Sequence, residues 1–101
     1  MDPEIRNVDE NHRYELVVDG ETAVVAYNLS GGNLMITETL VPRALEGRGV
    51  AGRMARHVTG DARARGLLIL PVCTFFSGWL KKHPEHADVV HPTYRGILGL
   101  S

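Results

Sequence analysis

The sequence predicts a mixed α/β (α+β) fold, in which an antiparallel three-stranded meander is followed by a helix and one parallel strand. Three runs between residues 14 and 41 alternate apolar and polar side chains, with tight turns between them. The apolar period then changes to 3.6 residues, and a short run without any polar face follows. A chain of 101 residues is one domain, so all of these elements share one core.

The first predicted strand covers residues 14–18, YELVV, and Asp19-Gly20 after it favours a tight hairpin turn. The second covers residues 22–29, TAVVAYNL, which are β-branched, aromatic and alternating. A second glycine-rich turn at residues 30–33 leads to the third strand, residues 34–41, LMITETLV. Consecutive strands joined by such turns form an antiparallel meander.

A helix is predicted from about residue 49 to residue 65, and Gly66 is placed to end it in the left-handed conformation. Its apolar stripe consists of Val50, Ala51, Met54, Ala55, Val58 and Ala62. Arg63 and Arg65 lie in the last turn, where positive charge suits the helix dipole. Gly60 inside the helix suggests close packing on the sheet.

The apolar run at residues 67–70, LLIL, predicts a fourth strand that is covered on both sides. A right-handed crossover places it parallel to the third strand, in a four-stranded sheet whose order follows the chain. Thr74 is predicted to cap a second helix, FFSGWLKKH, which Pro84 terminates. The segment from residue 91 to 101 has no clear period and is expected to be peripheral. Tyr94 in this segment could be a general acid, but its position in the fold does not follow from the sequence.

The charge balance argues against a nucleic-acid-binding protein. Eleven Lys and Arg stand against twelve Asp and Glu, for a net charge of −1, whereas nucleic acid requires a basic surplus. Arg56, Arg63 and Arg65 are expected to form a solvated helix face. Arg48 and Arg53 differ, because they flank a glycine-rich turn.

Other bulk features set expectations about compartment and assembly. Cys73 is the single cysteine, so an internal disulfide is impossible and a reducing compartment is favoured. The polar N-terminal residues resemble no signal peptide, and no run approaches the 18 apolar residues of a membrane span. We expect a cytoplasmic protein that is a monomer or a weak dimer.

The segment EGRGVAGR at residues 46–53 contains the spacing G-x-G-x-x-G, which is typical of a backbone that binds phosphate. The dinucleotide fold would need an acidic residue about 20 positions further on, where Pro71, Val72 and Cys73 stand. A nucleotide P-loop would need Gly-Lys-Ser/Thr at the end of the run, which is absent. Both nucleotide interpretations therefore fail.

The remaining interpretation is a ligand at the edge formed by residues 38–41, 47–53 and 71–74. Pro71 cannot donate a ladder hydrogen bond, so the third and fourth strands are expected to separate there. An extended ligand with amide groups could pair with the third strand while its pyrophosphate binds the helix N-terminus. These are the properties of coenzyme A.

Residues 46–51, EGRGVA, resemble the Q/R-x-x-G-x-G/A acyl-CoA signature of the GNAT acetyltransferases. The segments TETLVPRALEGRGVAGRM, ARARGLLILPVC and KKHPEHADVV, within about residues 34–90, resemble a minimal GNAT-like subfamily of this length. The resemblance implies a truncated GNAT-like fold, acetyl-CoA as co-substrate and N-acetyl transfer to an unidentified amine. Glu46 departs from the signature, Glu38 stands where the small subfamily often has histidine, and the acceptor-site elements of full-size members are missing.

The strand edge and the signature together give a set of predicted coenzyme-binding residues. They are Thr39, Leu40, Val41, Glu46, Gly47, Arg48, Gly49, Val50, Ala51, Gly52, Arg53 and Thr74.

Two residues are candidates for catalysis. Glu38 interrupts an apolar strand face and could be a desolvated general base, or a bulge could turn it to solvent. Cys73 lies between a strand end and a helix N-terminus, so it could carry an acyl group or be a small buried hydrophobe. Phe75, Phe76 and Trp79 are expected in the core or in a cleft wall.

His83, His86 and His91 fit no zinc spacing, and no metal site is predicted. Two functions besides acetyl transfer stay open. One is a coenzyme-binding or protein-interaction module without efficient turnover, and the other is a slow thioesterase.

Overall fold

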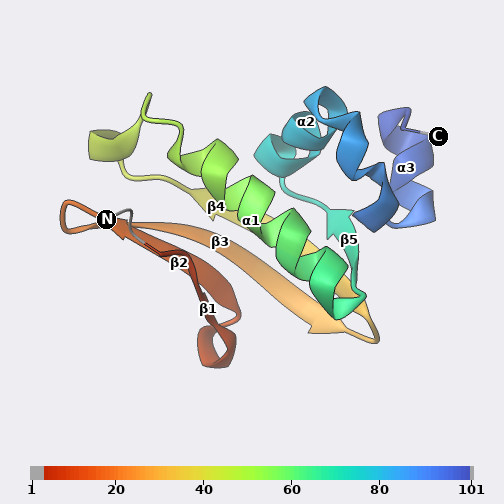
Figure 1. The fold of residues 1–101 in the computed structure, drawn as a ribbon, viewed down its shortest axis with the longest axis horizontal. Helices are drawn as coiled ribbons and strands as arrows, with labels where there is room; N and C mark the ends of the chain where they lie inside the picture. The colour runs from red at the N-terminus through yellow and green to blue at the C-terminus, as the bar shows by residue number, and fades with distance from the viewer. Residues whose placement is uncertain (1–3, 101) are drawn as a thin grey trace.

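The computed structural model describes residues 4–100 and shows a mixed sheet with helices (Figure 1). The strands are β1 (Arg6–Val8), β2 (Arg13–Val18), β3 (Glu21–Ser30), β4 (Asn33–Leu40) and β5 (Leu68–Pro71). The α-helices are α1 (Val50–Arg65), α2 (Thr74–Lys82) and α3 (Pro92–Leu98). The 3-10 helices are η1 (Asp9–Asn11), η2 (Arg43–Leu45) and η3 (Pro84–Val89).

The sheet has the order β1-β2-β3-β4-β5, antiparallel from β1 to β4, with β5 parallel to β4. This confirms the meander, the chain-order topology and the parallel crossover strand. The prediction of four strands is wrong, because Arg6–Val8 adds β1 beside β2. Three residues without an apolar alternation give no period that could have revealed this strand.

Both hairpin turns of the meander have positive φ at their two central residues. The angles are 51° at Asp19 and 79° at Gly20 in the first turn, and 55° at Gly31 and 84° at Gly32 in the second. This is the pattern of type I′ turns, whose twist matches that of the flanking strands. The turns therefore fix the strand register, and with it the face on which each side chain lies.

Helix α1 lies across one face of the sheet (Figure 1). The buried residues on that face of the sheet are Tyr14, Leu16, Ala23, Val25, Tyr27, Leu34, Ile36 and Ile69. Val50, Met54, Ala55, Val58 and Ala62 of the predicted helix stripe are buried as well. Residues that alternate with the buried ones point the other way, and Val17 is 51% exposed there.

Glycines begin and end α1, as its sequence pattern predicts. Gly66 has φ 68° and its N–H is directed to the carbonyls of Ala62 and Arg63, so the predicted left-handed stop is confirmed. Gly60 is different. It is exposed, and a Cβ added there would meet no atom within 4 Å, so the prediction of close packing on the sheet is wrong.

The C-terminal third differs from the prediction at two points. Helix α2 begins at Thr74 and Cys73 is its N-cap, without a side-chain cap, so the prediction that Thr74 caps the helix is wrong. The segment from residue 91 contains α3, which was not predicted because it has only seven residues and contains Gly96. Just before α3, the N–H of His91 donates to the carbonyl of Ile69 at 2.9 Å.

Tyr14 links the meander to α1 through a buried hydroxyl. Its side chain is fully buried, and the hydroxyl donates to the Asp61 carboxylate at 2.5 Å. Arg65 donates to the same carboxylate oxygen at 3.1 Å. Burial and the Asp61 carboxylate together raise the pKa of Tyr14 well above its ordinary range, so the hydroxyl stays protonated and donating.

Tyr14→Phe is expected to lower the free energy of unfolding by about 1–2 kcal/mol, because it removes a donor from a partly buried carboxylate. Urea unfolding at pH 7 measures the change. Tyr94→Phe is the matched control, since the Tyr94 hydroxyl forms no hydrogen bond among residues 4–100. A Tyr14→Phe protein as stable as its parent would show that the hydrogen bond adds nothing beyond the burial of the ring.

Candidate functional site

The connection between β4 and α1 is an open glycine turn. Gly47 has φ 79° and Gly49 has φ 74°, in the left-handed region where glycine is favoured. A Cβ added at either position would meet no atom within 4 Å. The turn therefore presents its backbone outward, without side chains over it.

Gly49 is the N-cap of α1 and provides no side chain to cap the helix. The bond from the Arg53 N–H to the Gly49 carbonyl, at 3.0 Å, closes the first turn. The N–H groups of Val50, Ala51 and Gly52 precede that bond and have no acceptor within the helix. Free N–H groups and the positive end of the helix dipole together favour a bound anion.

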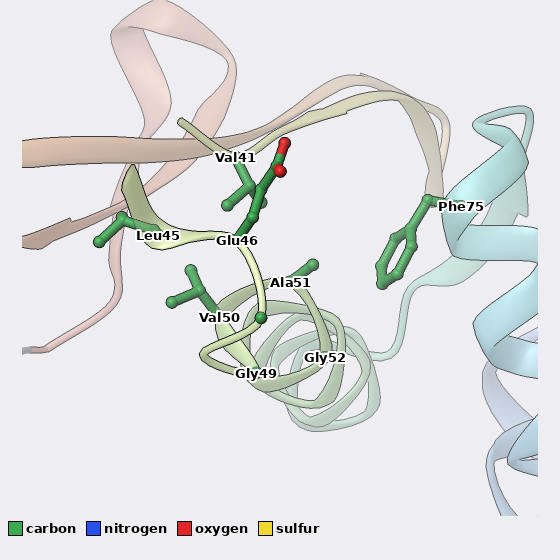
Figure 2. Close-up of a pocket in the computed structure, with 9 residues that line it drawn as sticks. Val41, Leu45, Glu46, Gly49, Val50, Ala51, Gly52 and Phe75 are labelled. Carbon is green, nitrogen blue, oxygen red and sulfur yellow. The ribbon is translucent and has the colours of Figure 1, made fainter. Parts of the chain in front are cut away.

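A pocket of about 330 Å³ adjoins this turn (Figure 2). Its lining residues are Val41, Leu45, Glu46, Gly47, Gly49, Val50, Ala51, Gly52 and Phe75. Figure 2 shows the Phe75 ring reaching from α2 across to the side on which Ala51 and Gly52 lie. The pocket therefore combines apolar walls with the exposed amides of one helix end.

Seven of the predicted coenzyme-binding residues line the pocket. They are Val41, Glu46, Gly47, Gly49, Val50, Ala51 and Gly52. The predicted residues Thr39, Leu40, Arg48, Arg53 and Thr74 do not line it. Leu45 and Phe75 line it in addition. The cleft-wall alternative for Phe75 is thus correct, whereas Leu45 lies in a 3-10 turn that has no sequence period of its own.

The two arginines beside the glycine turn lie differently. Arg48 pairs with Asp19 at 2.9 Å, and both side chains are largely exposed, so this ion pair joins the turn to the first hairpin. Arg53 lies in the first turn of α1 and is exposed.

Strands β4 and β5 pair over only part of the length of β4. Their ladder runs from Asn33 with Leu68 to Ile36 with Pro71, and the Cys73 N–H then donates to the Ile36 carbonyl at 2.9 Å. Beyond Ile36, β4 continues to Leu40 in register with β3 alone. The strand ends separate at Pro71 as predicted, and within residues 4–100 no strand pairs with the β5-facing backbone edge of residues 37–40.

A β-bulge lies where this separation begins. The register between β3 and β4 shifts between Ala26 and Tyr27, which leaves Thr37 as an extra residue on β4. After the bulge, Thr39 shares a row with Val25 and buried Tyr14, on the face that packs against α1. Glu38 shares a row with Ala26 and Arg13, on the opposite face.

The bulge separates the two catalytic candidates. The Cys73 thiol donates to the Thr39 hydroxyl at 3.4 Å, so Cys73 lies on the inner face, while Glu38 is exposed on the outer one. The prediction of a desolvated Glu38 is wrong, and the alternative of a bulge that turns it to solvent is correct. Cys73 is 8% exposed, as the buried-hydrophobe alternative predicts.

The histidines have local partners. His83 stacks on Trp79 with ring centroids 4.1 Å apart, His91 accepts from the Thr93 N–H at the start of α3, and His86 lies 3.2 Å from Arg63. Burial, aided by the nearby arginines, lowers the pKa of His86. Within residues 4–100, no three His, Cys, Asp or Glu side chains converge as a metal site would require. None of the helices described is long and apolar enough to cross a membrane.

Comparison with known proteins finds a family model and solved structures that match the chain. The family model for the GCN5-related N-acetyl-transferase matches residues 13–89, which include β2 to β5, α1 and α2. The solution structure of a GCN5-like protein from Staphylococcus aureus superposes with a TM-score of 0.71, at 24% sequence identity over 89% of each chain. That likeness shows that the two chains share a fold. No curated protein matches the sequence.

Proposed function

Because the chain belongs to the GCN5-related N-acetyltransferase family, we propose that it transfers an acetyl group from acetyl-coenzyme A to an amine. One observation carries the proposal: the uncapped amides of the glycine turn lie beside an edge of β4 with which no described strand pairs. Coenzyme A has a pyrophosphate, which the amides could bind, and an extended arm with two amide groups, which could pair with the strand edge.

In this proposal the amides of residues 49–52 hold the pyrophosphate of the coenzyme, and Val41 and Phe75 form apolar walls beside it. The arm with its two amides pairs with the free edge of β4 beyond Ile36. The thioester would then lie near Thr39 at the edge of the sheet, with Cys73 on its inner side and Glu38 on its outer side. Backbone N–H groups there would stabilise negative charge that develops on the thioester oxygen.

The acceptor amine would approach from the outer face, because Glu38 is exposed there and α1 covers the other face. Glu38 accepts a proton from the ammonium form of the acceptor, and the neutral nitrogen attacks the thioester carbon. The new C–N bond forms and the C–S bond breaks. The attacking nitrogen loses its extra proton, the coenzyme thiolate takes up one proton, and the products are the amide and the free thiol. This direct route needs two bound reactants and one base.

The experiment is a titration with acetyl-CoA, followed by incubation with a panel of amines. Trp79 is the single tryptophan and packs beside Gly52 of the pocket, so its fluorescence is expected to report binding. Mass spectrometry then detects acetylated amines. Binding without any acetylated amine would favour a coenzyme-binding module, and release of coenzyme without an acceptor would favour a thioesterase. Absence of binding would contradict acetyl transfer, thioester hydrolysis and a coenzyme-binding module, and would leave only a protein-interaction module.

The arginines beside the turn give a second test. Arg53→Gln is expected to weaken coenzyme A binding roughly 3- to 10-fold, because an exposed charge–phosphate contact is partly screened by solvent. Arg48→Gln removes the other arginine that flanks the turn and is expected to weaken coenzyme A binding as well. Pantetheine, which lacks phosphate, is the control ligand in calorimetry. Equal losses for pantetheine and coenzyme A would show that the arginines support the fold alone.

A further inference from the structure

Beyond the pocket, α1 and α2 pack against each other. Phe75 and Trp79 are one turn apart on α2, and Gly52 and Arg56 are one turn apart on α1. A Cβ added at Gly52 would lie 3.6 Å from Nε1 of Trp79, and the Arg56 guanidinium lies 5.7 Å from the centre of the Trp79 ring. The second turn of α1 therefore holds a cation over an aromatic ring of α2, next to the pocket.

The charge of Arg56 is not neutralised as the charges of its neighbours on the helix are. Arg63 binds the Asp88 carboxylate at 2.8 Å, and Arg65 binds Asp61 at 3.1 Å. Arg56 contacts no carboxylate among residues 4–100, and its partner is the face of Trp79. A cation–π contact positions a guanidinium while leaving its donors available to an anion.

Trp79 is a rigid support for this cation. It is 8% exposed and its ring stacks with His83 and with His86, at centroid distances of 4.1 and 5.3 Å. Its indole N–H is a donor that forms no hydrogen bond among the residues described, and Nε1 lies beside Gly52, which has no side chain to cover it. The indole N–H of Trp79 and the charged guanidinium over the same ring are thus both available as donors to an anion.

We propose that Arg56 and Trp79 form a second anion subsite that binds the 3′-phosphate of coenzyme A. The inference rests on the proposed function, which places the pyrophosphate at the amides of residues 49–52. In coenzyme A the 3′-phosphate lies one ribose away from the pyrophosphate. Arg56 lies four residues beyond Gly52, about 6 Å along the helix axis, which is a comparable spacing. The subsite makes the protein select coenzyme A over its 3′-dephospho form.

The test compares the dissociation constants of coenzyme A and 3′-dephospho-CoA by calorimetry. The parent protein is expected to prefer coenzyme A by about 10-fold, as a partly shielded charge-assisted contact gives. Arg56→Gln is expected to reduce this preference to about 1 while leaving the affinity for 3′-dephospho-CoA unchanged. Arg63→Gln is the matched control on the same helix, because Arg63 is bound by Asp88, and it should retain the preference.

Trp79→Phe provides a second variant that keeps an aromatic ring and removes the N–H, and it should lower the preference by about 3-fold. A parent protein that binds both ligands equally, or an Arg56→Gln protein that keeps the full preference, would overturn the subsite and leave the proposed function intact. A parent protein that binds neither ligand would overturn the proposed function together with the subsite.

Discussion

Gly49→Glu is expected to weaken the binding of coenzyme A by more than about 100-fold, because the new carboxylate would lie at the position proposed for the pyrophosphate. The substitution places a negative charge beside the amides of residues 50–52 and fills the open side of the turn. The fold should survive, since a Cβ at Gly49 would meet no atom within 4 Å. Calorimetric titration gives the affinity, and circular dichroism checks the helix content.

Gly49→Ala separates charge from backbone strain. Both substitutions put a side chain at φ 74°, which costs about 1–2 kcal/mol in the left-handed region. Alanine adds no charge, so its loss of affinity should be far smaller than that of glutamate at similar stability. A folded Gly49→Glu protein that binds coenzyme A like its parent would place the phosphates elsewhere.

The second large effect concerns the choice between direct transfer and an acyl-enzyme. Glu38→Gln is expected to lower kcat/KM for acetyl transfer by about 100-fold, as loss of a general base does. Cys73→Ala is expected to stay within about 3-fold of the parent, allowing for a small packing loss. The reason is structural: the thiol is buried and donates to Thr39, and among residues 4–100 no carboxylate or imidazole is bonded to it.

The matched control for the carboxylate is Glu21→Gln, at the exposed start of β3, which should leave kcat/KM unchanged. Intact-mass measurement after incubation with acetyl-CoA alone tests the other route. A protein acetylated at Cys73, and discharged by an amine at the rate of turnover, would show that Cys73 carries the acyl group. Loss of all activity in Cys73→Ala would support the same conclusion.

The parts of the fold that the sequence predicts are those with local signals. The meander follows from period-two alternation and from Asp19-Gly20 and Gly31-Gly32, whose positive φ angles allow type I′ turns. Helix α1 follows from its stripe and from Gly66. Strand β1 and helix α3 have three and seven residues, and their partners are set by tertiary contacts that no short window contains.

The candidate site divides in the same way. Glycine spacing predicts the turn, because the positive φ observed at Gly47 and Gly49 is a conformation that glycine adopts without steric cost. The face of the sheet on which Glu38 lies depends on a bulge at Thr37, which shifts the in–out alternation of the side chains by one residue. No residue type in the strand indicates this bulge. The pairing of Arg56 with Trp79 joins two helices, so it required the packing of α1 on α2.

The backbone contact between Ile69 and the segment before α3 bears on solubility at high concentration. An apolar strand at the border of a sheet invites a strand of another molecule to pair with it. Here Val90 forms a parallel bridge to Ile69, and the His91 N–H occupies the Ile69 carbonyl, so the outer side of β5 is partly satisfied within the same molecule. The opposite border, β1, is three residues long and carries Arg6. Both edge strands thus oppose intermolecular strand pairing. At β5 the segment at Val90 and His91 occupies the edge, and at β1 the strand is short and charged.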